Sequence, residues 1–186
     1  MKKWIIALAG LGILWAIHPF RGIDAGSLCV VETLLIETEE GEISVASGEL
    51  TGTGDTVQAA LEGRLGGWAR EPWDRLALIL LLDQFTRNIH RGTPQAFAGD
   101  RLALELALGA IDSGFDLRLP EVLRIFIYLP LEHAEDPAMQ RRSVQAFAVL
   151  AEAAGTSTDL AQFLQGTLDY AWRHQEVIAR FGRFPH

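Results

Sequence analysis

The sequence predicts a mainly α protein: an antiparallel helical bundle or an array of helical hairpins, with a short β-hairpin near the N-terminus. From Val57 onward, six segments of helical character are separated by short breaks at proline and glycine. Short connections make successive helices antiparallel neighbours. Before Val57, residues 28–56 are rich in Val, Ile and Thr, which is typical of strands. With 186 residues, 49% of them hydrophobic and 22% charged, the chain is long and apolar enough for a folded core.

Residues 1–25 resemble a signal or a membrane anchor. Two lysines precede an apolar run from Trp4 to Ile17, as in the n-region and h-region of a secretory signal. The run is short for a membrane span, which needs about 20 residues. Periodicity does not separate this interpretation from an ordinary buried helix, so membrane contact through residues 4–17 and a folded segment both stay open.

Residues 26–56 are predicted to be rich in strand and loop. The hairpin strands are Cys29–Thr38 and Glu42–Ser47, with a turn at Glu39–Gly41, and residues 48–55 form a loop. Cys29 is the only cysteine, so an intrachain disulfide and a cysteine-based zinc site are excluded.

The predicted all-helical domain covers residues 57–186, and its helices start at recognisable residues. Pro72 suits the first turn of a helix over Trp73–His90. Asp136 followed by Pro137 is an N-cap with proline at the first helical position, while Pro130 is expected to kink or end the preceding helix. The predicted helices are 57–70, 73–90, 100–112 with Asp100 as its cap, 121–129, 137–154, and 159–181 with Thr158 as its cap.

The helix over Trp73–His90 is predicted to be central and buried, because its apolar residues lie nearly all round it. A polar group follows directly at its C-terminal end. On a helix, Asp83, Arg87 and Arg91 stack at i, i+4 and i+8. Buried charges are tolerated only when they are paired and hydrogen-bonded. We therefore expect this group to form either a structural network or the floor of a site.

Three polar groups are embedded in apolar or aromatic sequence, which favours inward-facing side chains. Trp172 and Phe184 flank the third group and are predicted to line it. The groups are Asp83, Gln84, Arg87, Asn88 and Arg91; Glu132, His133, Glu135 and Asp136; and His174, Arg180, Arg183 and His186.

One interpretation of these groups is a charge-paired structural network, since guanidinium–carboxylate forks hold helices in register. The expected pairs are Arg87 or Arg91 with Glu132 or Glu135, and Asp83 with Arg180 or Arg183.

The alternative interpretation is a charged pocket between helices, where bundles build their sites. In one version, Arg87, Arg91, Arg180 and Arg183 bind a small anionic ligand. In a weaker version, Glu132, His133 and His174 hold a metal for a hydrolase, with Asp136 as a second-shell orienter or general base. It is weaker because Glu132 and His133 are adjacent and point about 100° apart on a helix.

Three long motifs occur in one order: LALILLLDQFTRNIHRGTPQAFAGD, IYLPLEHAED and HQEVIARFGRFPH. Through them, residues 57–186 resemble the bacterial family of unknown function numbered 924, of the tetratricopeptide-like helical superfamily. The resemblance implies a tetratricopeptide-like helical array and a cytoplasmic location, and it brings no established activity, cofactor or catalytic residue. By fold analogy, such arrays also serve as scaffolds that bind peptides in a groove.

The net charge of −8 and the pI of about 5.1 exclude a broad surface for nonspecific nucleic-acid binding. Among the interpretations of the three polar groups, the predicted function is binding of a small anionic ligand. The alternatives are an interaction scaffold with a structural network and a metal-dependent hydrolase.

Overall fold

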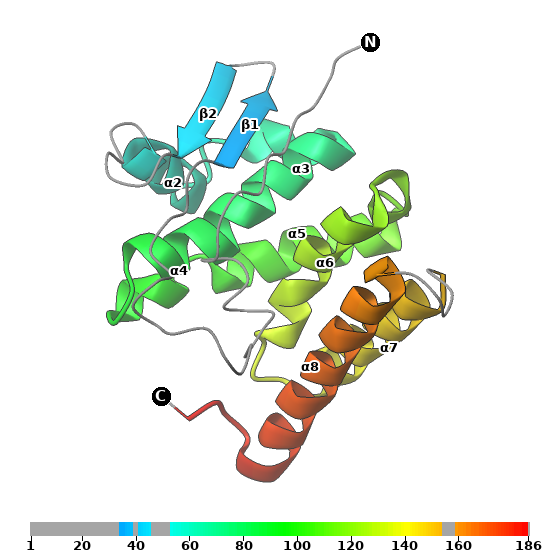
Figure 1. Ribbon diagram of the computed structural model, residues 1–186. Helices are drawn as coiled ribbons and strands as arrows, with labels where there is room; N and C mark the ends of the chain where they lie inside the picture. The colour runs from blue at the N-terminus through cyan, green and yellow to red at the C-terminus, as the bar shows by residue number, and fades with distance from the viewer. Residues whose placement is uncertain (1–33, 39–40, 46–52, 154–158, 186) are drawn as a thin grey trace.

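The computed structural model describes residues 34–38, 41–45, 53–153 and 159–185, and in these it shows antiparallel helices with a β-hairpin at one end (Figure 1). Strands β1 (Leu34–Thr38) and β2 (Gly41–Val45) pair antiparallel, with Leu34 opposite Val45 and Thr38 opposite Gly41. The hairpin lies where the sequence predicts it. The expected start at Cys29, the end at Ser47 and residues 1–25 lie outside the described residues.

The helical part is mainly α, as predicted. Its elements are α2 (Thr53–Leu61), the 3₁₀ turn η1 (Gly66–Arg70), α3 (Pro72–Ile79), the π-helical turn η2 (Leu80–Phe85), α4 (Thr86–Ile89), η3 (Pro94–Phe97), α5 (Asp100–Asp112), η4 (Asp116–Arg118), α6 (Glu121–Glu132), α7 (Pro137–Ala153) and α8 (Asp159–Phe181). Among the described residues after Val57 there is no strand, as the sequence predicts.

The first predicted helix, 57–70, is wrong as a single element. Helix α2 begins at Thr53 and ends at Leu61, and η1 follows separately. The break comes at Gly63, whose φ of 74° lies in the left-handed region that glycine adopts readily.

Elements α3, η2 and α4 follow one another without a gap and form the predicted central helix. Residues 76–82 are all buried in the core, with exposures of 0–4%. The helix is not regular, however, because η2 is a π turn. The Thr86 amide and hydroxyl both donate to the carbonyl oxygen of Leu81, five residues earlier. Such π turns are rare and are often found at functional sites.

Pro130, predicted to kink or end its helix, does not end it, because α6 continues past it to Glu132. Proline lacks the amide for one intrahelical bond, but Pro130 lies in the last turn. The amide of His133 closes that turn by donating to the Leu129 carbonyl at 2.8 Å. Glu132 and His133 are therefore held in regular helical geometry.

The caps are confirmed in one case and corrected in another. Asp136 is the predicted N-cap of α7, accepting the amides of Ala138 at 2.6 Å and Met139 at 3.1 Å through Oδ1. Asp100 is not a cap: Gly99 is the N-cap of α5 and Asp100 is its first residue. The Asp100 side chain instead accepts a hydrogen bond from Arg87. Thr158 lies outside the described residues.

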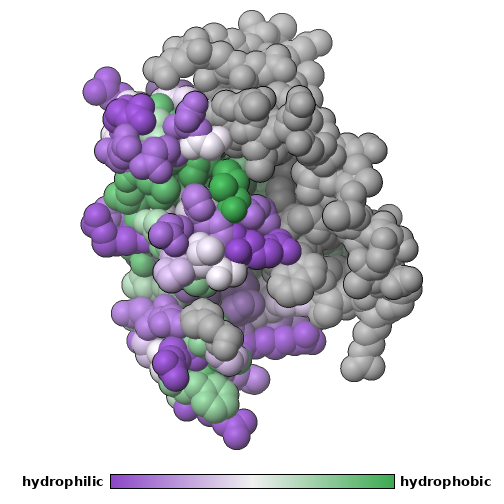
Figure 2. Space-filling view, turned by 90° about the vertical axis from the view of Figure 1, so that its left-hand side faces the viewer, coloured by the Kyte–Doolittle hydropathy of each residue, from purple (hydrophilic) through white to green (hydrophobic). Residues whose placement is uncertain are grey.

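Helices α7 and α8 pack side by side along their lengths, and α6 packs against α7 (Figure 1). Figure 2 shows one face of the molecule, where hydrophilic residues alternate with smaller hydrophobic areas over the described part. This is expected for helices whose apolar stripes face inward. No helix in the described part of the chain has both the length and the apolar character needed to cross a membrane.

Candidate functional site

The first element of the site is a carboxylate–imidazole pair between η2 and the end of α6. Asp83 is 1% exposed, and its Oδ1 lies 2.7 Å from Nδ1 of His133. The His133 side chain is 16% exposed. Asp83 also accepts a hydrogen bond from the amide group of Gln84 through Oδ2. The buried carboxylate thus holds one nitrogen of a partly accessible imidazole.

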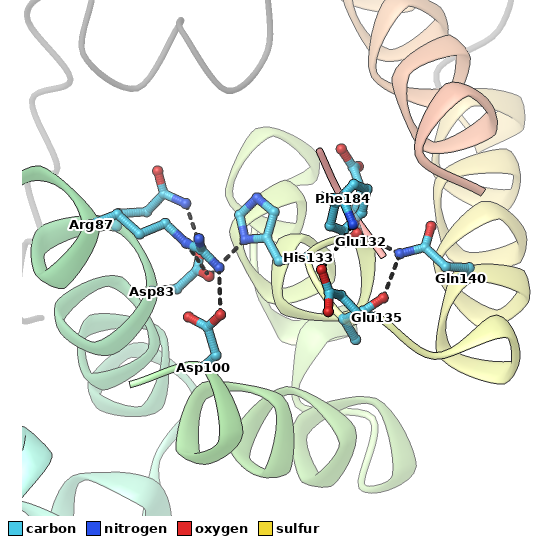
Figure 3. A network of polar contacts seen from close by, with 10 residues as sticks. Asp83, Arg87, Asp100, Glu132, His133, Glu135, Gln140 and Phe184 are labelled. Carbon is cyan, nitrogen blue, oxygen red and sulfur yellow. Dashed lines mark hydrogen bonds and ion pairs between the residues drawn. The ribbon is translucent and has the colours of Figure 1, made fainter. Parts of the chain in front are cut away.

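Arg87 extends this pair to helix α5. Its Nε lies 3.4 Å from Asp83 Oδ1, and its Nη2 donates to Oδ2 of Asp100 at 2.8 Å. The guanidinium also lies over the ring of Phe97, 5.1 Å from the centroid. In Figure 3, Arg87 reaches across Asp83 toward Asp100, with His133 on the other side of Asp83. The positive charge of Arg87 is therefore shared by two carboxylates.

The two carboxyl groups differ in their electrostatics. Burial raises the pKa of Asp83, but His133, Arg87 and Gln84 more than offset burial, so the pKa lies below its usual value. Burial raises the pKa of Asp100, with the Asp83 charge adding to the rise and Arg87 opposing it. Oδ1 of Asp100 is buried and has no hydrogen-bond partner among the described residues. Asp83 is thus the firmly ionised member of the pair.

A second carboxylate–imidazole pair joins α6 to α8. Glu132 is 2% exposed, and its Oε1 lies 3.0 Å from Nδ1 of His174, whose side chain is 28% exposed. The same Nδ1 lies 3.0 Å from the carbonyl oxygen of Tyr170. With two acceptors this close, Nδ1 carries the proton. Burial lowers the pKa of His174, but Glu132 and the Tyr170 carbonyl outweigh burial, so the pKa is raised.

The end of α6 is also fixed from α7 and from the C-terminal segment. Gln140 is fully buried, and its Nε2 donates to the carbonyl oxygens of Glu132 at 2.6 Å and Ala134 at 2.8 Å. The amide of Phe184 donates to Oε1 of Glu135 at 2.8 Å. The two bonds from Gln140 satisfy carbonyl oxygens at and just beyond the end of α6, where the intrahelical ladder leaves them unpaired. They hold Glu132 and His133 on a rigid support (Figure 3).

The structure brings together only part of each predicted group and corrects the pairing. Asp83 pairs with His133 and Arg87 rather than with Arg180 or Arg183. The partners of Arg87 are Asp83 and Asp100 rather than Glu132 or Glu135. Glu132 pairs instead with His174. The physical reason for these pairs is the position of the cations. His133 and His174 lie half-buried beside the carboxylates, whereas Arg180 and Arg183 are exposed to solvent.

The remaining predicted residues lie at the edge of this network or away from it. Arg91 is exposed and donates to Oδ1 of the exposed Asn88 at 3.1 Å. Arg180 is exposed over the ring of Phe181 at 5.0 Å, and Arg183 is exposed. Asp136 serves as the N-cap of α7, and Trp172, predicted to line the third group, is 50% exposed. Phe184 does line it, with its ring 5.2 Å from that of His174. His186 lies outside the described residues.

Sequence reasoning missed two residues of the network. Asp100 was interpreted only as a cap, since sequence does not show which chain passes beside α4. Gln140 had a usable signal: it lies at i, i+3, i+4 and i+7 spacing with Ser143, Val144 and Phe147, all buried on one face of α7. A glutamine on such an apolar stripe indicates a buried amide that must find partners.

The metal interpretation depended on Glu132, His133 and His174 sharing one ion. Nδ1 of His133 faces Asp83, while Glu132 faces His174. Among the residues that the structure describes, no three His, Cys, Asp or Glu side chains are arranged to hold a metal ion.

The raised pKa of His174 gives the fold a pH dependence. A protonated imidazole beside Glu132 stabilises the native state, and this contribution is complete below the unfolded pKa of about 6.5. It is lost as the pH rises through the higher pKa of the folded protein. We therefore expect His174→Gln to cost more stability near pH 5.5 than near pH 8.5 in urea denaturation. His90→Gln, on the half-buried histidine that ends α4, serves as the control. An equal cost at both pH values would contradict the charged pair.

The fold and the network define a class: a mainly helical protein in which the C-terminal end of α6 joins two carboxylate–histidine pairs. The chain belongs to the family of bacterial proteins of unknown function DUF924, whose family model matches residues 50–186. Among solved structures, a protein of unknown function from Agrobacterium tumefaciens is 41% identical, with a TM-score of 0.60. The match covers 72% of this chain and 68% of that one. No curated protein is significantly similar to the chain.

Proposed function

We propose that this protein binds a small anionic ligand at His133 and His174, beside the end of α6. The observation that carries the proposal is that two adjacent residues, Glu132 and His133, belong to two separate carboxylate–imidazole pairs. Each pair combines a buried carboxylate with a partly accessible imidazole. A network that served packing alone would gain little from keeping both imidazoles within reach of water.

The arrangement determines which ring nitrogens are available. In both histidines Nδ1 faces its carboxylate, which leaves Nε2 for a ligand. In Figure 3 the second ring nitrogen of His133 points away from Asp83. A neutral imidazole that donates from Nδ1 can only accept at Nε2, whereas an imidazolium donates from both nitrogens. An anion is therefore bound by the protonated form.

The charges of the network explain why the histidines, rather than the arginines, are the proposed contacts. Asp83 and Asp100 together bring two negative charges to the one positive charge of Arg87, so this guanidinium offers no net attraction to an anion. Each histidine meets its carboxylate through Nδ1 and keeps Nε2 for a second partner. The raised pKa of His174 favours its charged form. Anion binding should therefore strengthen as the pH falls and more of the His174 imidazole is protonated. The scaffold interpretation rests on the fold alone, whereas this one rests on specific side chains.

The proposal predicts ligand stabilisation that depends on both histidines. A ligand at 100 times its Kd stabilises the native state by about 2.7 kcal/mol. We expect inorganic phosphate to raise the Tm of the wild type more near pH 5.5 than near pH 8, at constant ionic strength. His133→Gln and His174→Gln should lose this shift, and His90→Gln should keep it.

The measurement is a thermal-shift titration with phosphate and with succinate, using chloride to match the ionic strength. The two anions distinguish a phosphate site from a carboxylate site. Equal shifts in all variants would indicate a general salt effect and would contradict the proposal, as would the absence of any shift with either anion.

A further inference from the structure

The four residues that follow α8, Gly182 to Pro185, turn back from the end of the helix (Figure 1). We call them the C-terminal strap. Gly182 has a φ of 71°, and its amide bonds to the carbonyl oxygen of Ile178 at 2.9 Å. This is the left-handed ending that glycine gives to helices. It directs the strap away from the helix axis and back onto the protein.

Phe184 of the strap contacts both the segment that follows α6 and helix α8. Its amide donates to Oε1 of Glu135, 49 positions earlier in the sequence, at 2.8 Å. Its ring meets the imidazole of His174 edge-on, with centroids 5.2 Å apart and an interplanar angle of 72°. Phe184 therefore lies directly on the imidazole of the Glu132–His174 pair.

The anchorage of the strap is weak compared with that of the helices. Its hydrogen bond lies in an exposed position, since Glu135 is exposed. Arg183 and Pro185, on either side of Phe184, are also exposed, and Phe184 itself is only half-buried. Segments with few buried contacts open locally at a small fraction of the global unfolding free energy. The end of α6 beneath the strap is rigid by contrast, because Gln140 holds it from the buried side.

We propose that the strap is a partial lid over His174: Phe184 shields one side of the imidazole when its amide is bound to Glu135, and a ligand gains full access to His174 when the strap lifts at Gly182. This inference rests on the proposed function, because it assigns the gate of the same site. His133 lies on the Asp83 side of the network, and its contact with Asp83 does not involve the strap. The two histidines should therefore differ in how much their accessibility depends on Phe184.

The test measures how fast diethyl pyrocarbonate modifies each histidine, read by peptide mass spectrometry near pH 8, where the neutral imidazoles react. Phe184→Ala removes the cover, and Glu135→Ala removes the acceptor that anchors it. Both variants should increase the modification rate of His174 several-fold and leave that of His90 unchanged. Phe181→Ala is the matched control, because this aromatic residue is on the same helix end but is 59% exposed. It should leave the rate of His174 unchanged.

Unchanged rates of His174 in both Phe184→Ala and Glu135→Ala would overturn the lid. A common increase at all histidines would also overturn it, because this indicates unfolding rather than gating; circular dichroism of each variant identifies that case. The proposed function is read separately, from protection of His174 by inorganic phosphate in the wild type near pH 6, where more of the protonated imidazole that binds an anion is present than near pH 8. If phosphate protects His174 but Phe184→Ala and Glu135→Ala do not raise its modification rate, the anion site stands and the lid is rejected. If the two variants raise the rate but phosphate does not protect His174, the lid stands and the anion site is rejected.

Discussion

Replacing Asp83 with alanine should lower the free energy of unfolding by about 3–5 kcal/mol, the cost of removing one partner from a buried ion pair. The carboxylate is 1% exposed and is contacted by His133, Arg87 and Gln84. Without it, the His133 imidazole loses its acceptor, and the partly buried guanidinium of Arg87 keeps only Asp100. The measurement is urea denaturation near pH 7, with the midpoint and slope determined for each variant.

Asp83→Asn and Glu105→Ala make this test specific. Asparagine keeps the shape of the side chain but removes its charge and replaces one acceptor oxygen by an NH2 donor. It therefore separates lost packing from the loss of charge and of hydrogen-bond acceptors. Glu105 pairs with Arg101 on the surface of α5, where both side chains are more than half exposed. Losing such a pair costs about 0–1 kcal/mol. If Asp83→Ala cost no more than Glu105→Ala, the network would not stabilise the fold.

Gly99→Ala should destabilise the protein by about 3 kcal/mol, at the upper end of the usual cost of overpacking. A Cβ at this position would lie 2.2 Å from the carbonyl oxygen of Leu82 and 2.8 Å from its carbonyl carbon. These are backbone atoms of the π turn, so no side chain can rotate to make room. Either α5 or the central helix must shift.

That shift should also disturb the site, because Gly99 precedes Asp100 and Leu82 precedes Asp83. Moving the two segments apart would weaken the bond between Arg87 and Asp100. Gly166→Ala is the matched control, since nothing lies within 4 Å of a Cβ at this position of α8. Alanine there should stabilise the helix by about 0.5–1 kcal/mol. Thermal denaturation distinguishes the two, and a neutral Gly99→Ala would show that the segments do not pack this closely.

Local chemistry was enough to predict some elements and not others. Asp136 and Pro137 start α7 because capping and proline geometry act within one turn. Leu78 to Leu82 were predicted to be buried, and they are, because no surface helix is apolar all round. Helix α6 continues past Pro130 because Leu129 and Leu131, on either side of it, are buried in the core, and their packing offsets the loss of one amide bond.

The sequence by itself determined the helical class, the hairpin, the buried central helix and the polar groups that had to be satisfied. These follow from periodicity, capping and the cost of burying charge, all of which act within short segments. Only the tertiary structure decided the partners: His133 for Asp83, His174 for Glu132, and Asp100 for Arg87. Any carboxylate can pair with any cation. Which pairs form therefore depends on the packing that brings α5, α6 and α8 together with the central helix. The close approach of Gly99 to Leu82 is one such contact, made between segments that no local pattern connects.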